Sequence, residues 1–368
     1  MGIPEKIKAI QEEMAKTQLN KATEHHIGLL RAKLAKLRRE QEEKKSKKSQ
    51  RSEGFDIKRS GDATVVFIGL PSVGKSTLLN RLTDAASKVG AYKFTTLNVV
   101  PGMLEYRGAK IQLLDLPGII KGASSGKGLG KKILSVARSA DLVLLMLDVF
   151  QPFHHDVLVN ELANIGIRLN QKPPNIVIEK TTSGGLSVAQ QVKLTKMSES
   201  LLKDILRVYG INSGRALIRE DVSAEQFIDF ISGNKTYAQS LVVINKIDLV
   251  DKKFLDELRK KISLDFIDTS ADAGINIDLL KEKIYEKLRF IRIYMKPKGG
   301  ETDFKEPLIT REGSTIGDVC DKLHRRMRRE FRYAMVWGKS VKFGGQRVGI
   351  DHVLQDEDVL TIVKSHGV

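Results

Sequence analysis

The sequence predicts an α/β fold in which a mainly parallel sheet is covered by helices on both faces. Short continuous apolar runs, such as TVVFIG at 64–69 and DLVLLMLD at 141–148, have the composition of strands buried on both sides. Helical stretches separate these runs, and glycine-rich turns follow several of them. Because ligands bind at the carboxyl ends of strands in such sheets, we expect the functional residues in those turns.

The N-terminal segment has the periodicity of amphipathic helices. Ile27, Leu30, Leu34 and Leu37 recur at steps of three and four, and a similar stripe precedes them. The pattern predicts two helices within residues 4–45, forming a hairpin. A charged stretch without apolar residues follows, so we predict a basic helical hairpin and linker over residues 1–55.

Three further parts follow this hairpin. The strand series predicts a nucleotide-binding domain over residues 60–290, interrupted by an α+β subdomain at 149–240. Exposed apolar positions in this insert are expected either to pack on the main domain or to bind a partner. The last segment, 291–368, alternates short strands with one helix and predicts a β-grasp module.

The composition and charge limit the kinds of partner that the protein is expected to bind. The 368 residues contain 62 Lys+Arg, 45 Asp+Glu and a single cysteine, giving a formal charge of +17. The net charge is +7 over residues 1–60 and +4 over 291–368. These basic ends are expected either to bind RNA phosphates or only to keep the protein in solution. No disulfide framework, zinc spacing, membrane span or secretory signal is expected. We predict a cytoplasmic protein with no membrane or DNA partner.

GLPSVGKS at 69–76 fits the phosphate-binding pattern G-x-x-x-x-G-K-[ST] between a strand and a helix. Its glycines allow successive N–H groups to surround a phosphate, Lys75 reaches the β- and γ-phosphates, and the Ser76 hydroxyl binds Mg²⁺. A plain glycine turn is the alternative. The residues predicted to surround the nucleotide phosphates are Gly69, Leu70, Pro71, Ser72, Val73, Gly74, Lys75, Ser76 and Thr77.

Three more motifs end other predicted strands. In DLPG at 115–118, Asp115 is placed to bind Mg²⁺ through water, and the N–H of Gly118 to contact a γ-phosphate. In NKID at 245–248, Asp248 accepts hydrogen bonds from guanine N1–H and N2–H₂, a donor pair that adenine lacks, so GTP is selected over ATP.

Around the base, Asn245 is expected to fix the loop and Lys246 to lie along the base, while Ser270 and Ala271 offer backbone donors to O6. Between the phosphate loop and DLPG, KFTTLNVVPG carries Thr95 and Thr96, either of which can complete the Mg²⁺ shell.

Together, GLPSVGKS, FTTL, DLPGIIKGASSGKGLG and NKID resemble the Obg-like branch of translation-factor GTPases. The helical N-terminus, the insert and a terminal module similar to a TGS domain resemble the developmentally regulated GTP-binding protein (DRG) family. The resemblance implies that Thr96 binds Mg²⁺ and that Lys75, Thr96 and Gly118 serve catalysis. It also implies a cytoplasmic GTPase associated with ribosomes, ribosomal RNA and a family regulatory protein.

Ile119 follows DLPG, where many GTPases carry the glutamine that orients the attacking water. Slow hydrolysis of GTP to GDP and phosphate is therefore expected. The resemblance implies use of a monovalent cation, but potassium-binding relatives have asparagine where this chain has Ser72. Mg²⁺ is therefore the expected cofactor, and the sequence leaves open whether K⁺ is a second one.

The segment 322–332 holds six Lys/Arg, with Leu323, Met327 and Phe331 at helical spacing. It predicts one basic helix that contacts RNA or the ribosome through Arg325, Arg326, Arg328 and Arg329. Tyr333 and Trp337 are expected either in the module's core or as stacking groups. The alternatives to a regulatory GTPase are a ribosome- or RNA-binding scaffold with structural GTP, and an RNA-remodelling enzyme.

Overall fold

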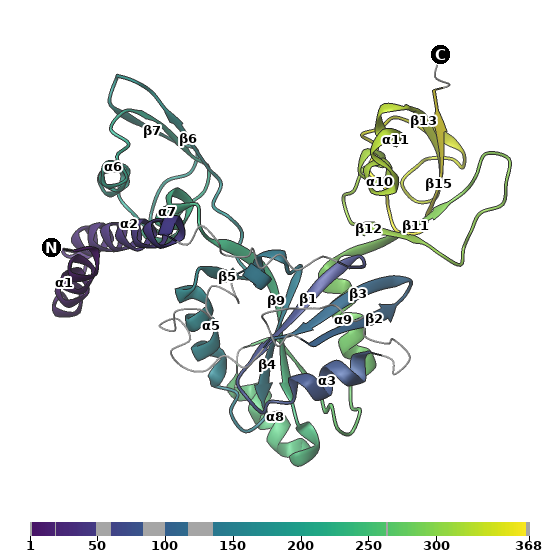
Figure 1. Ribbon diagram of the computed structural model, residues 1–368, viewed down its shortest axis with the longest axis horizontal. Helices are drawn as coiled ribbons and strands as arrows, with labels where there is room; N and C mark the ends of the chain where they lie inside the picture. The colour runs from purple at the N-terminus through teal and green to yellow at the C-terminus, as the bar shows by residue number, and fades with distance from the viewer. Residues whose placement is uncertain are drawn as a thin grey trace. The chain divides into compact units, whose positions relative to one another are not determined.

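The computed structural model describes residues 2–18, 20–48, 60–83, 100–116, 135–262 and 264–365. The chain forms two compact units (Figure 1). One unit is built from residues 1–55 and 166–237, and the other from 56–165 and 238–368. Within the described ranges, none of the helices combines the length and the apolar character that a membrane span requires.

The first unit joins the N-terminal helices to most of the predicted insert. Leu201, Leu202 and Phe227 of the insert form a core with Ala32 of the long N-terminal helix, because apolar faces of two insert helices pack on that helix. The apolar positions of the insert are therefore largely covered from within the unit. Its elements are α1 (Ile3–Lys16), α2 (Glu24–Lys48), β5 (Ile167–Leu169), β6 (Ile176–Lys180), β7 (Leu186–Gln190), α6 (Glu199–Val208), β8 (Gly214–Ile218) and α7 (Ala224–Ser232).

The second unit contains the main sheet, whose strands follow the order β10-β9-β4-β1-β3-β2. All neighbours on this path are parallel except β2 and β3, which form an antiparallel hairpin. The elements are β1 (Ala63–Gly69), α3 (Lys75–Leu82), β2 (Val100–Tyr106), β3 (Ala109–Asp115), β4 (Leu142–Asp148), α5 (His154–Asn164), β9 (Thr236–Asn245), η1 (Ile247–Leu249), α8 (Lys252–Lys261), β10 (Phe266–Asp268) and α9 (Ile277–Leu288).

The central strands are buried along nearly their whole length, as the continuous apolar runs predict. Leu78 of α3 and Leu280 of α9 pack with Phe67 of β1 in one core. The register places Phe67 opposite Asp115, and Asp148 opposite Asn245. The polar residues that end these strands therefore gather at one edge of the sheet.

Residues 290–364 form a second sheet with the order β12-β11-β15-β13-β14. One face of this sheet packs on α10 through Ile293, Val336 and Leu360, and Figure 1 shows α10 and α11 beside β13 and β15. The elements are β11 (Phe290–Met295), β12 (Leu308–Arg311), α10 (Ile316–Leu323), α11 (Arg325–Arg329), β13 (Phe331–Trp337), β14 (Gln346–Val348) and β15 (Asp358–Lys364).

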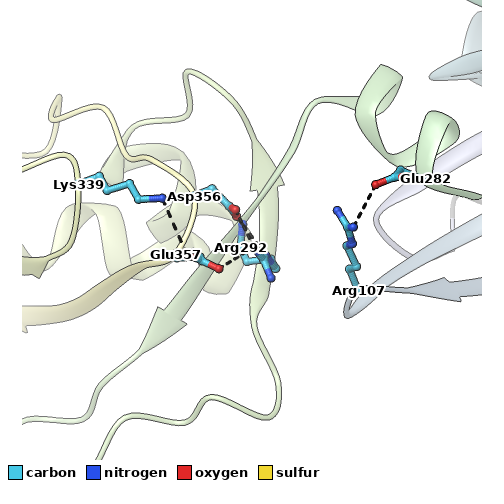
Figure 2. A network of polar contacts seen from close by, with 6 residues as sticks. All are labelled: Arg107, Glu282, Arg292, Lys339, Asp356 and Glu357. Carbon is cyan, nitrogen blue, oxygen red and sulfur yellow. Dashed lines mark hydrogen bonds and ion pairs between the residues drawn. The ribbon is translucent and has the colours of Figure 1, made fainter.

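An aromatic cluster marks the passage from α9 into β11. Tyr285 packs edge-on against both Tyr106 and Phe290, with ring centroids 5.8 and 5.6 Å apart. At the tip of the β2–β3 hairpin, Arg107 lies over the rings of Tyr106 and Tyr285 and forms an ion pair with Glu282 at 3.2 Å (Figure 2). These contacts fix the end of α9 against the hairpin.

Candidate functional site

The predicted phosphate loop connects β1 to α3. Ser72 and Gly74 both have left-handed backbone conformations, with φ of 63° and 88°. A Cβ atom on Gly74 would lie 2.3 Å from Asn245 Nδ2, so glycine is required there both for its conformation and for this close approach. Gly74 caps the N-terminus of α3, where free N–H groups and the helix dipole favour an anion.

Lys75 begins α3 and is only 7% exposed. Its ammonium group donates to the carbonyl oxygens of Gly69 and Leu70, at 3.2 and 2.9 Å. Burial lowers the pKa of Lys75, and the negative charge of Asp115 partly opposes this shift. The lysine is thus held within the loop that it is predicted to serve.

Asp115 ends β3 beside the first turn of α3. Its Oδ2 accepts a hydrogen bond from the Ser76 hydroxyl at 2.5 Å. Its Oδ1 is buried and has no hydrogen-bond partner among the described residues. Two of the residues predicted to serve one Mg²⁺ ion are therefore brought into contact, and Oδ1 of Asp115 can accept from a further donor.

Asn245 joins the predicted base loop to the phosphate loop. Its side chain is 1% exposed, Nδ2 donates to Val73 O at 2.9 Å, and Oδ1 accepts from the N–H of Ala271 at 2.9 Å. One amide thus holds two segments that are far apart in the sequence. The next residue, Lys246, is left-handed with φ of 70°, while Asp248 is exposed.

Ser270 and Ala271 follow β10 and are both buried. The N–H of Ser270 donates to Ile275 O at 3.2 Å, and that of Ala271 donates to Asn245. In this structure both predicted donors to guanine O6 already have acceptors within the protein. Their contact with the base stays a prediction.

Two residues of the site are missed by the sequence reasoning. Asp148 ends β4 and forms an ion pair with Lys246 at 2.7 Å, so it orients the lysine of NKID. The sequence pattern could have indicated Asp148, because the apolar run DLVLLMLD ends in an aspartate just as IQLLD does. Arg81 of α3 donates to the carbonyls of Ala271 and Asp272, and nothing in its sequence context indicates this.

Thr96 and Gly118 lie outside the described residues, as do Thr95 and Ile119. Their predicted roles in Mg²⁺ binding and catalysis therefore stay predictions.

The basic segment near the C-terminus is not the single helix that its spacing predicts. His324 is extended, with φ of −167° and ψ of 135°, and it separates α10 from the short α11. Its ring Nδ1 accepts from the N–H of Arg326, and Phe331 already begins β13. Strand pairing with β15 takes the chain out of the helix, so the predicted apolar stripe is broken.

The four arginines of this segment differ. Arg328 forms an ion pair with Asp321, which raises the pKa of its guanidinium. Arg326 and Arg329 are exposed. Arg325 begins α11. Their contact with RNA stays a prediction.

Comparison with known proteins identifies the parts of the chain. Residues 64–180 match the family described as "50S ribosome-binding GTPase", 183–290 match "C-terminal region of MMR_HSR1 domain", and 291–364 match the TGS domain. An uncharacterized GTP-binding protein of Methanocaldococcus jannaschii is 57% identical over 99% of this chain and 93% of its own length. Developmentally-regulated GTP-binding protein 2 of Homo sapiens is 47% identical over 99% of this chain and 100% of its own length.

Solved structures with a similar fold are much more distant in sequence. The YchF GTPase of Schizosaccharomyces pombe is 14% identical with a TM-score of 0.46, and covers 83% of this chain and 99% of that chain. A GTP-binding protein of Pyrococcus horikoshii is 15% identical with a TM-score of 0.44, over 82% and 99%. The family models and the two relatives confirm the predicted fold class and family. The chain belongs to the developmentally regulated GTP-binding protein family and is a P-loop GTPase with a C-terminal TGS domain.

Proposed function

We propose that this GTPase binds GTP·Mg²⁺ where the phosphate loop, Asp115, the NKID loop and the Ser270–Ala271 turn meet, and hydrolyses it slowly to GDP and phosphate. The observation that carries the proposal is the pair of hydrogen bonds made by Asn245, to Val73 O and from Ala271 N–H. This amide fixes the base loop relative to the phosphate loop through contacts within the protein itself. A preformed site loses less free energy in ordering its loops when it binds.

The residues beside the phosphate loop suit Mg²⁺, a hard cation that prefers oxygen ligands and retains several waters. P-loop GTPases as a family use this ion. Here the Ser76 hydroxyl would bind it directly, and the free Oδ1 of Asp115 would accept from a metal-bound water. Thr96 is proposed as the ligand from the switch segment. Bound Mg²⁺ would neutralise negative charge that develops on the phosphate oxygens.

Slow hydrolysis is proposed because the side chain of Ile119 can form no hydrogen bond with the attacking water. Lys75 and backbone N–H groups, with Gly118 among them, would stabilise charge in the transition state. K⁺ is proposed as a further activator. Ser72 occupies a left-handed position with φ of 63°, a conformation that asparagine tolerates well, so a Ser72→Asn change would introduce an amide carbonyl without new backbone strain.

The first experiment measures steady-state GTP hydrolysis in KCl and in NaCl. We expect turnover that is stimulated by K⁺, abolished in Lys75→Ala, and raised in KCl by Ser72→Asn. Lys110→Ala, which removes an exposed lysine of β3, is the matched control and should leave turnover unchanged. Tight GTP binding without turnover in either salt would contradict autonomous hydrolysis and favour a switch that awaits its partner.

We further propose that the protein acts in the cytoplasm as a ribosome-associated factor, contacting ribosomal RNA and a regulatory protein of its family. The basic ends of the chain and the exposed Arg326 and Arg329 support a polyanionic partner. The nucleotide would control the association. Indifference of ribosome binding to GTP or GDP would instead favour the scaffold alternative.

Co-sedimentation with ribosomes at several salt concentrations tests this association. Alanine at all four of Arg325, Arg326, Arg328 and Arg329 should weaken it and flatten its salt dependence, because phosphate contacts release counterions. The matched control replaces four exposed lysines of α8, namely Lys252, Lys253, Lys260 and Lys261, by alanine. Equal effects of the two variants would assign the association to net charge alone.

A further inference from the structure

The TGS sheet has two faces of different chemistry. One face packs on α10 through Ala334, Val336 and Leu360. Because side chains alternate along a strand, Tyr333 and Trp337 of β13 point to the opposite face. We call this second surface the open face, and its residues are Tyr294, Lys296, Phe304, Tyr333, Met335, Trp337 and Arg347.

Aromatic rings and cations are paired on the open face. The guanidinium carbon of Arg347 lies 3.8 Å from the ring centroid of Tyr333, and the ammonium of Lys296 lies 4.8 Å from that of Trp337. The ring of Phe304 packs on Tyr294 with centroids 5.1 Å apart, although Phe304 is 65% exposed. An aromatic side chain so exposed contributes little to the core, which leaves its outer surface free for a ligand.

The charge of the open face is positive. Neither Lys296 nor Arg347 forms an ion pair among the described residues. The carboxylates of Asp356 and Glu357 are neutralised by Arg292, and Glu357 also approaches Lys339, as Figure 2 shows. The two cations over the rings are therefore available to anionic groups of a ligand.

We infer that the open face of the TGS sheet binds single-stranded RNA. Unpaired bases stack on aromatic rings and on guanidinium groups, and the phosphates between them attract the neighbouring cations. The bases of a duplex are stacked inside it and could not contact the rings. An acidic peptide would form ion pairs with the two cations but would leave the aromatic rings without a partner. Tyr333 and Trp337 are four residues apart on one strand, about 13 Å, so the face spans more than one nucleotide. The inference rests on the proposed association with ribosomal RNA and gives it a specific surface.

The test uses the full-length protein with GTP and fluorescein-labelled 12-nucleotide oligo(U) and oligo(A), followed by anisotropy at several KCl concentrations. Phe304→Ala should weaken binding about tenfold, since one stacked base contributes ~1–3 kcal/mol. Arg347→Ala should weaken it and lower the salt slope by about 0.7, the value for one phosphate contact of a single strand. Unchanged GTP turnover checks that both variants are folded.

Two control variants match these changes. Phe153→Ala removes a phenylalanine that is 72% exposed but lies in the GTPase domain, and Arg219→Ala removes an exposed arginine outside the TGS domain. Both should bind RNA nearly as the unaltered protein does. An effect of Arg219→Ala equal to that of Arg347→Ala would overturn the inference, because it would reduce the binding to overall charge.

Ribosome co-sedimentation of the same variants separates this inference from the proposed function. If the protein sediments with ribosomes but Phe304→Ala and Arg347→Ala bind RNA normally, the open face is refuted and the ribosome association stands. If these variants no longer co-sediment with ribosomes but still bind RNA, the open face contacts a protein and the inference also fails. RNA binding through the face without any ribosome association would retain the inference and refute the proposed function.

Discussion

Replacing Asn245 by alanine tests whether one buried amide holds the nucleotide site together. The change removes the donor to Val73 O and the acceptor for Ala271 N–H, each at 2.9 Å. A buried backbone group left without a partner costs ~1–3 kcal/mol, so the two together predict a loss of about 2–4 kcal/mol when water partly replaces the amide.

Thermal unfolding of the nucleotide-free protein and binding of a fluorescent GDP analogue measure the two consequences. We expect a lower melting temperature in Asn245→Ala and a GDP affinity at least tenfold weaker, since ~1.4 kcal/mol corresponds to one factor of ten. Asn80→Ala, at an exposed asparagine of α3, is the matched control. Unchanged stability and GDP affinity in Asn245→Ala would refute the reasoning that this amide couples the two loops.

Three further outcomes are expected. Asp229→Ala should cost about 1.5–3 kcal/mol in urea unfolding followed by circular dichroism, because it removes the bidentate carboxylate partner of the half-buried Arg168 at 2.6 and 3.0 Å; a loss below ~0.5 kcal/mol would contradict this. Burial lowers the pKa of Lys75, so the unfolded chain keeps that proton to higher pH, and the nucleotide-free protein should gain stability as pH rises from the lowered pKa toward the ordinary lysine value; Lys75→Met should abolish this gain. Burial, and then the charge of Asp321, raises the pKa of the Cys320 thiol, so a thiol reagent should react only as the TGS domain unfolds in urea, and rapid reaction of the native protein would contradict its burial.

The sequence alone was sufficient for the fold class and for the chemistry of the motifs. Buried parallel strands require continuous apolar runs, and a phosphate loop requires glycines at fixed offsets, so both leave local patterns. Asp115 and Asn245 could be predicted for the same reason, because each is the polar residue that ends an apolar strand. The ligand group that each motif binds, phosphate or guanine, also depends on hydrogen-bond donors and acceptors within a few residues of one another, so it too could be predicted from the sequence.

Only the tertiary structure decided which distant groups meet. Val73 and Asn245 are 172 residues apart, and Arg81 reaches a turn 190 residues further along the chain. The packing of the insert on α2 depends on which apolar faces are complementary, which periodicity does not specify. The break at His324 follows from the pairing of β13 with β15, because a strand partner outside the local window overrides the helical spacing.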